Sequence, residues 1–259
     1  MESRIITKNL SFAYKTKQII NNVNLRIEPG QVLVILGPNG IGKSTLLNCL
    51  SGVLTQYNGQ ICVNGDDLKT MTIKDLSHQL ALVSQGVNIK SNLTLFDYLL
   101  LGRTSFHTIF EQPDDTDKRI VEDIIEEIGL NDYAQTSLQS MSGGQRQLAI
   151  IGRALAQEPQ VLIMDEPTSA LDYRNQTVVL KLIRRLSSKG ISIIMSTHDP
   201  NQAQIIGDLV GLLIDNQTYL QGVTKQILND DNLSELYGTS ISSTYNESLD
   251  RKIFGIGMD

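Results

Sequence analysis

Apolar and polar positions alternate with a period of two through much of the first third of the chain, which is the pattern of β-strands. The alternation covers residues 4–9 and returns at 23–27, just before the turn Glu28-Pro29-Gly30. Short apolar segments at 61–63 and 81–83 predict two further strands.

The segment Val32–Leu36 differs because every position in it is apolar, so we expect a strand buried on both faces. A glycine-rich segment follows, and then a helical pattern that ends at Gly52. The apolar positions of that helix are Leu46, Leu47 and Leu50.

Between about residues 88 and 159 the periodicity becomes helical. Apolar residues recur every three or four positions in three stretches, at 96–100, at 120, 124 and 128, and at 148–155. Residues 112–118 are polar and contain a proline, which predicts a linker between two of these helices.

After Pro159 the chain alternates again between strands and helices. Strands are expected at 161–164, 191–195 and 209–214, with a helix near 174–188. The pattern therefore predicts an α/β core into which a helical block is inserted.

Composition narrows the possible functions. The chain has 259 residues, and its net charge of −6 argues against a protein that binds nucleic acid. No apolar run reaches the ~18–20 residues needed to cross a bilayer, and the start has no apolar signal segment. We therefore expect any membrane role to depend on a separate partner subunit. Cys49 and Cys62 are expected to be buried, reduced thiols in a cytosolic protein.

The glycine-rich segment fits the phosphate-loop pattern G-x-x-x-x-G-K-[ST], and a strand precedes it and a helix follows, as that loop requires. Its residues are Gly37, Pro38, Asn39, Gly40, Ile41, Gly42, Lys43, Ser44 and Thr45. Glycines allow the backbone amides to approach phosphates closely. We expect Lys43 to reach the β- and γ-phosphates and Ser44 to bind Mg²⁺.

The strand predicted at 161–164 ends in two carboxylates, Asp165 and Glu166. In a parallel sheet, ligands gather at the carboxyl ends of strands, which predicts that Asp165 lies beside the phosphate loop and holds Mg²⁺. Glu166 is a candidate general base for an attacking water. Alone, such a pair would fit a solvated strand end equally well.

Residues Ser142-Gly143-Gly144-Gln145 open one of the predicted helices. Ser142 and Gln145 form a capping-box pattern, which needs no glycine. Two residues without Cβ leave backbone N–H groups open to an anion, so we interpret this segment as a second phosphate-binding surface. Since the chain has no second phosphate loop, this surface is expected to close over a nucleotide held by another copy.

Together these motifs resemble the nucleotide-binding subunits of ABC transporters, over about residues 4–238. The residues that carry the resemblance are Gly37–Thr45, Gln85, Met141–Gln145, Asp165, Glu166, Ser169–Asp172 and His198. The resemblance implies a P-loop NTPase core with a RecA-like mixed sheet, an N-terminal antiparallel β subdomain and an inserted helical subdomain.

The resemblance also implies roles for individual residues. Tyr14 matches the aromatic residue that stacks on adenine, and Gln85 matches a glutamine that touches Mg²⁺ and the water and links to the membrane subunit. His198 matches a histidine that contacts the γ-phosphate, and Asp172 matches a loop that contacts the opposing subunit. Met141 departs from the usual leucine, and we expect only a modest effect because Met is apolar and flexible.

From the resemblance we expect an ATP- and Mg²⁺-dependent ATPase that works as a homodimer with two shared sites. Its partners would be transmembrane permease subunits and, indirectly, an extracytoplasmic substrate-binding protein, which places it peripherally on the cytoplasmic face of the membrane. The ATPase domain is expected over 1–238, with the core at 1–87 and 158–221 and the helical subdomain at 88–157. Residues 222–259 are expected to form C-terminal helices and a tail, of which 239–259 give no clear pattern.

The motif sequences around Gln145, Asp172 and His198, together with the stretch 95–103, are similar to subunits of metal-chelate importers. That group handles iron–siderophore complexes, haem, vitamin B12 and oxyanions such as molybdate, and an iron complex is our first choice. Two alternatives stay open, a soluble ABC ATPase of DNA repair or translation and an exporter subunit.

Overall fold

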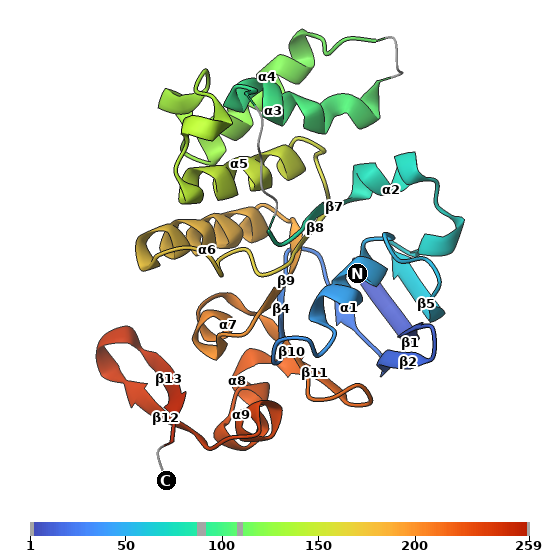
Figure 1. Ribbon diagram of the computed structural model, residues 1–259, viewed down its shortest axis with the longest axis vertical. Coiled ribbons are helices and arrows are strands. Elements are labelled where there is room, and N and C mark those ends of the chain that lie inside the picture. Colours follow the sequence, from blue (N-terminus) through green and yellow to red (C-terminus); the bar gives the residue numbers. More distant parts are fainter. Residues whose placement is uncertain (1–2, 87–91, 108–110, 258–259) are drawn as a thin grey trace.

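The computed structural model describes residues 3–86, 92–107 and 111–257. Its centre is a six-stranded sheet with the order β11-β10-β4-β9-β8-β7 (Figure 1). All neighbours are parallel except β10 and β11. The strands are β4 (Val32–Leu36), β7 (Leu80–Val83), β8 (Val161–Met164), β9 (Ser192–Thr197), β10 (Leu209–Leu213) and β11 (Tyr219–Val223).

The central strand β4 is fully buried, as its unbroken apolar sequence predicts. Leu33 and Ile35 belong to one core cluster and Val32, Val34 and Leu36 to another, because successive side chains of a strand point to opposite faces. The sheet therefore has a separate apolar core on each face, and both cores fix the position of the loop that leaves β4.

An antiparallel sheet and helix α1 (Lys43–Leu50) cover the first face. The sheet contains β1 (Ile5–Tyr14), β2 (Lys17–Val23), β3 (Arg26–Ile27), β5 (Asn58–Val63) and β6 (Asp66–Asp67). The turn η1 (Leu68–Thr70) and helix α2 (Ile73–Gln79) lead from it back to β7. The strands expected around 4–9, 61–63 and 81–83 are confirmed.

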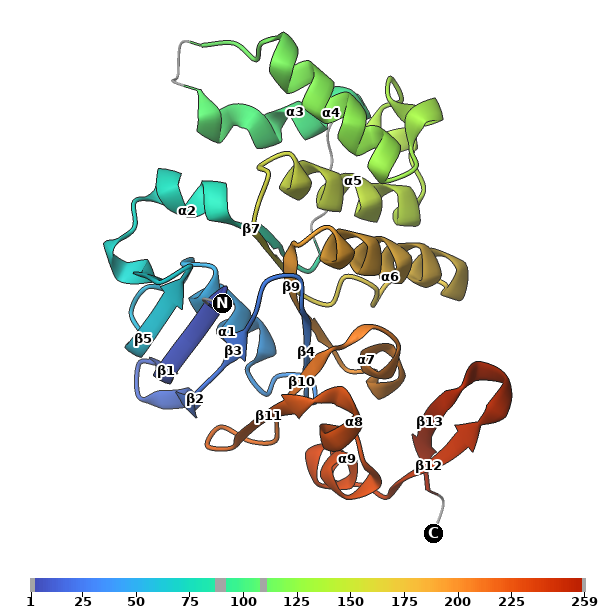
Figure 2. The same cartoon turned by 180° about the vertical axis from the view of Figure 1, so that it is seen from behind.

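Helices cover the second face and continue into a helical part at one end of the molecule (Figures 1 and 2). That part contains α3 (Leu95–Leu100), η2 (Leu101–Phe106), α4 (Asp115–Glu127), η3 (Asn131–Tyr133), η4 (Leu138–Ser140) and α5 (Gly143–Leu155). Two further helices pack beside the sheet, α6 (Tyr173–Ser188) and α7 (Pro200–Ile206).

The sequence prediction for α4 needs two corrections. The helix begins at Asp115, inside the predicted linker 112–118, because Asp114 caps it and Asp117 completes a capping box. Asp117 is buried, where the Arg103 Nε donates to it at 2.8 Å. The buried face of the helix is formed by Val121 and Ile125, with the predicted 120 and 124 positions only at its margin.

The C-terminal region ends in a β-hairpin at the opposite end of the long axis (Figures 1 and 2). It follows α8 (Thr224–Ile227) and α9 (Asp230–Tyr237) and consists of β12 (Ile241–Asn246), η5 (Glu247–Leu249) and β13 (Arg251–Ile256). No strand was predicted for these residues.

The two cysteines are free thiols, as expected, but only Cys49 is buried. Burial raises the pKa of Cys49 to about 12, so this thiol stays protonated and unreactive. Cys62 is partly exposed, and the expectation of burial was wrong for it. In the described part of the chain, every helix is too short or too polar to span a membrane.

Candidate active site

The phosphate loop connects β4 to α1 and bends through conformations that favour glycine. Gly40 and Gly42 have φ values of 79° and 122°. A Cβ on Gly42 would also lie 3.0 Å from the Ile19 side chain, so both backbone geometry and space require glycine there. Helix α1 then begins without a side-chain cap, which leaves its first amides free for an anion.

Lys43 is the cation of this loop, and its side chain is only 5% exposed. Its Nζ donates to the carbonyl oxygens of Gly37 at 2.8 Å and Pro38 at 3.2 Å. The Oε1 of Glu166 lies 3.4 Å from the same nitrogen. The loop therefore holds a buried ammonium group at its centre, paired with the glutamate that follows β8.

Asp165 and Glu166 follow β8 directly and are directed differently by one hydroxyl. The Ser196 Oγ donates to the Asp165 carboxylate at 2.5 Å and accepts the Glu166 backbone N–H at 2.9 Å. Glu166 has φ 46°, a left-handed backbone that costs a side-chain-bearing residue on the order of 1 kcal/mol. This turn separates the two neighbouring carboxylates.

The Glu166 carboxylate brings three of the predicted side chains together. Its Oε2 accepts a hydrogen bond from the Gln85 Nε2 at 3.2 Å, and the His198 Nδ1 lies 3.5 Å away. Its Oε1 faces Lys43. These residues come from four segments far apart in the sequence, each placed at the carboxyl end of a strand or at the start of α1.

A cavity of about 430 Å³ opens beside the loop. It is lined by Tyr14, Ile19, Asn39, Gly40, Gly42, Lys43, Ser44, Thr45, Gln85 and Glu166. Tyr14 is half exposed at its edge and meets Phe12 edge to face, with ring centroids 4.9 Å apart. One face of an aromatic ring is thus available to a planar ligand.

The start of α5 is a separate surface. The Ser142 Oγ accepts the Gln145 N–H at 3.3 Å, and the Gln145 Oε1 accepts the Ser142 N–H at 2.8 Å, so the predicted capping box is confirmed. Residues 142–145 are all described, and they are not among those that line the cavity at the phosphate loop. Asp172 caps α6 by accepting the Asn175 N–H at 2.8 Å.

The two glycines of this segment differ. A Cβ on Gly143 would meet no atom within 4 Å, whereas a Cβ on Gly144 would lie 2.4 Å from the Asn175 side chain. Packing within the chain therefore explains the glycine at 144. Steric contacts within the chain do not explain the glycine at 143, which is consistent with contact to an external ligand.

Sequence reasoning missed three residues near the site. Ser196 orients both carboxylates, Ile19 lines the cavity, and Asn175 packs on Gly144. Ser196 could have been noticed as a polar residue that directly follows the apolar run Ile193–Met195 in strand β9. The other two give no signal, because their positions depend on contacts between distant segments.

Comparisons with known proteins identify the family of the chain. The family model described as ABC transporter matches residues 20–169, more than half of the chain. The iron(3+)-hydroxamate import ATP-binding protein FhuC of Bacillus subtilis is 32% identical over 232 residues, covering 89% of this chain and 86% of that protein. The molybdate import ATP-binding protein MolC of Haemophilus influenzae is 32% identical, covering 92% and 89%.

A solved structure is similar over nearly the whole length. It is described as a metal-chelate type ABC transporter in an inward-facing conformation, with a TM-score of 0.87, 30% identity and 98% of each chain covered. The match includes the region of the C-terminal hairpin, which lies beyond the family model. With its phosphate loop, the carboxylates after β8 and these relatives, the chain belongs to the ABC transporter family and is one of its ATP-hydrolysing, ATP-binding subunits.

Proposed function

We propose that two copies of this chain hydrolyse ATP at two shared sites, each built from the phosphate loop of one copy and the start of α5 of the other. The observation that carries the proposal is the position of residues 142–145. They present open backbone at Gly143 and yet lie apart from the cavity at the phosphate loop of their own chain. A second copy would supply the missing wall of that cavity.

Within one site, the residues around Glu166 divide the chemistry. Lys43 would neutralise charge on the transferring phosphoryl group, together with His198 and the partner's first-turn amides. Glu166 would polarise the attacking water. Gln85, which donates a hydrogen bond to the Glu166 carboxylate, would hold that carboxylate and the water in place. Tyr14 would stack its free face on adenine.

The residues that would hold Mg²⁺ are Ser44, Gln85 and Asp165. They offer a hydroxyl, an amide oxygen and a carboxylate, which are the oxygen donors that Mg²⁺ prefers. Ser196 fixes the Asp165 carboxylate, so this donor is preorganised. When bound, the ion would offset the negative charge of the phosphates.

Mixed dimers test the shared site. A Lys43→Ala chain and a Ser142→Arg chain should each be inactive, while a mixed pair keeps one intact site with the loop of one chain and the α5 start of the other. Random pairing should restore about a quarter of the normal ATPase rate.

The matched control mixes Lys43→Ala with Glu166→Gln. Both changes fall on the loop side of a site, so no mixed pair contains an intact one and no activity should return. If the first mixture is as inactive as the control, although mixed dimers are shown to form, the shared-site proposal is wrong.

We further propose that the chain powers import of a metal chelate, with an iron–siderophore complex as the first candidate, by binding permease subunits at the cytoplasmic membrane face. Relatives named for import of iron(3+)-hydroxamate and of molybdate support a role in import, and their names give two substrate classes to compare. Uptake of radiolabelled iron-hydroxamate and of molybdate should be compared in cells with and without this gene. Loss of iron uptake alone would support our choice, and loss of molybdate uptake alone would replace it.

A further inference from the structure

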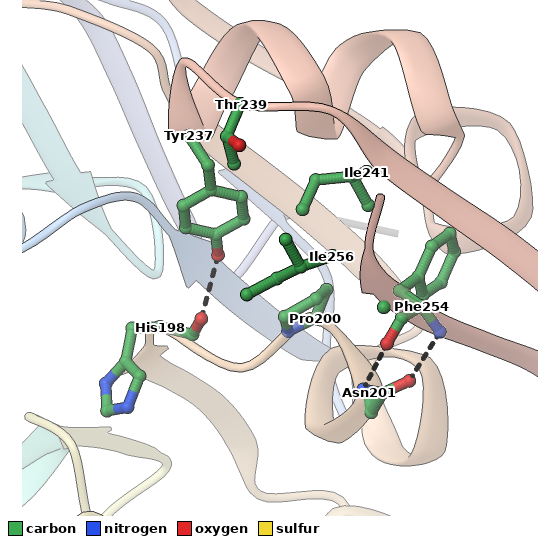
Figure 3. A pocket seen from close by; sticks show the side chains of 9 residues that line it. His198, Pro200, Asn201, Tyr237, Thr239, Ile241, Phe254 and Ile256 are labelled. Atoms are coloured by element: carbon green, nitrogen blue, oxygen red, sulfur yellow. Dashed lines mark hydrogen bonds between the residues drawn. The ribbon is translucent and has the colours of Figure 1, made fainter. Parts of the chain in front are cut away.

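The C-terminal hairpin packs against the segment that carries His198. The two enclose a cavity of about 290 Å³, lined by His198, Pro200, Asn201, Tyr237, Thr239, Ile241, Phe254, Gly255 and Ile256 (Figure 3). Most of this lining is apolar. The polar contacts across it are few, and each reaches the segment from His198 to Asn201, which leads from the end of β9 into the first turn of α7.

Two sets of hydrogen bonds connect the C-terminal region to this segment. The Tyr237 hydroxyl, at the end of α9, donates to the backbone carbonyl of His198 at 2.9 Å. The Asn201 side chain donates to the Phe254 carbonyl at 3.2 Å and accepts the Phe254 N–H at 2.9 Å. Its amide thus bonds both backbone groups of Phe254 in β13 (Figure 3).

The hairpin is itself firmly attached. Phe254 is 5% exposed and belongs to the core cluster that also contains the β9 and α7 side chains. The Ser234 Oγ accepts the Ile241 N–H at 2.9 Å, and the Asp230 carboxylate accepts the Ser243 N–H at 3.1 Å. Helix α9 and the hairpin therefore form one anchored unit on which Tyr237 is fixed.

In the described part of the chain, the His198 side chain is loosely held. Its imidazole is 52% exposed, and Nδ1 is 3.5 Å from Glu166, too far for a firm hydrogen bond. The short backbone connection between β9 and α7 sets its place, and within it the Thr197 Oγ1 accepts the Asp199 N–H at 3.2 Å. Asp199 caps α7 from one side of that connection, and Tyr237 fastens the carbonyl of His198 from the other.

We propose that Tyr237 is a positioning residue for ATP hydrolysis, which holds His198 at Glu166 by fastening its backbone carbonyl to the C-terminal unit. The inference rests on the proposed role of His198. Burial raises the pKa of Tyr237, so the phenol remains protonated and able to donate this bond throughout the physiological range.

The first test is Tyr237→Phe, which removes the hydroxyl and keeps the ring. We expect kcat to fall about five-fold, the typical effect of losing one hydrogen bond, with KM for ATP unchanged because Tyr237 does not line the nucleotide cavity. The matched control is Tyr245→Phe. Its hydroxyl donates to Asp250 within the hairpin, so its removal should leave kcat unchanged.

A double variant separates positioning from general stability. In a His198→Ala background, Tyr237→Phe should cause no further loss, because the residue through which it acts is already absent. An equal loss in both backgrounds would overturn the proposal. If Tyr237→Phe does not fold, Asn201→Ala, which releases β13 from α7, takes its place in the same comparison.

A spectroscopic readout does not depend on turnover. The chain has three histidines, so the imidazole resonances of His198 can be identified by comparison with His198→Ala. Tyr237→Phe should shift them and Tyr245→Phe should not. If His198→Ala hydrolyses ATP normally, the proposed role of His198 fails, while an unshifted His198 resonance in Tyr237→Phe would refute the positioning itself.

Discussion

Helices α1 and α5 both have a glycine at their start, Gly42 just before α1 and Gly143 as the first residue of α5, but their first turns are built differently. Helix α1 has no side-chain cap and opens into a cavity that already contains Lys43 and Glu166. Helix α5 has a complete capping box and an open Gly143, and the cation of its first turn, Arg146, donates to the backbone carbonyl of Met141. The first is equipped to bind a phosphate within the chain, whereas our proposal makes the second one wall of a site that another copy completes. If two copies share their sites as proposed, a single copy is half of a working unit.

The largest expected effect on the ATPase rate comes from a change in the cavity at the start of α1. Glu166→Gln keeps the shape of the side chain but removes the proposed base, so kcat should fall by about 10²–10⁴. ATP binding should persist, and the variant should accumulate as an ATP-bound dimer. Steady-state ATPase rates and size-exclusion chromatography with ATP measure both outcomes. A variant with the normal rate would show that Glu166 is not the base.

Gly143→Ala tests the start of α5, which the proposal places against the nucleotide of another copy. The added methyl group has room within the chain, so the thermal unfolding midpoint should not fall. If a partner's nucleotide occupies that space, ATPase activity should drop about ten-fold, as expected when a preorganised contact to the phosphoryl group is disturbed. Normal activity would indicate that this face binds no nucleotide.

Gly144→Ala should behave differently, because its methyl group meets the Asn175 side chain. We expect a loss of about 1 kcal/mol in the free energy of unfolding, the lower end of overpacking costs. Asn175→Ala in the same chain should restore it, which denaturant titrations of both variants can measure. A stability loss for Gly143→Ala as well would remove the distinction between the two glycines.

The smallest effect is expected at the rim of the cavity. Tyr14→Ala removes a half-exposed ring that would stack on adenine, and ATP affinity should fall a few-fold, since one exposed aromatic contact contributes about 1 kcal/mol. Tyr14→Phe should retain it. Equilibrium binding of a fluorescent ATP analogue measures both, and equal affinity in all three chains would exclude the stacking role.

Most of the core could be predicted because its signals are local. The unbroken apolar run of β4 and the carboxylates after β8 each report on burial and sheet position without any distant contact. The start of α4 was missed because Asp117 looks like a linker residue until Arg103 is brought against it. The hairpin was missed because β12 is only partly buried along its length and so carries little apolar periodicity.

The same contrast applies to the site. The phosphate-loop pattern and the carboxylates after a predicted strand pointed to Lys43 and Glu166, and the family resemblance pointed to Gln85 and His198. The structure brings these four side chains together. It could not identify Ser196 or Tyr237, since a hydroxyl acquires its role only from the backbone group that the fold places opposite it. The residues that orient a functional side chain are thus harder to infer from sequence than the functional side chain itself.

The Lys43 Nζ lies 3.4 Å from the Glu166 Oε1, so the proposed phosphate-binding cation and the proposed base restrain each other. While the ammonium group is shared with the carboxylate, the glutamate is held toward the loop, where a triphosphate would have to enter. An arriving nucleotide must compete for that lysine, and its success would release the glutamate just when there is a bond to break. The binding of ATP would then free the Glu166 carboxylate for its proposed role as the base.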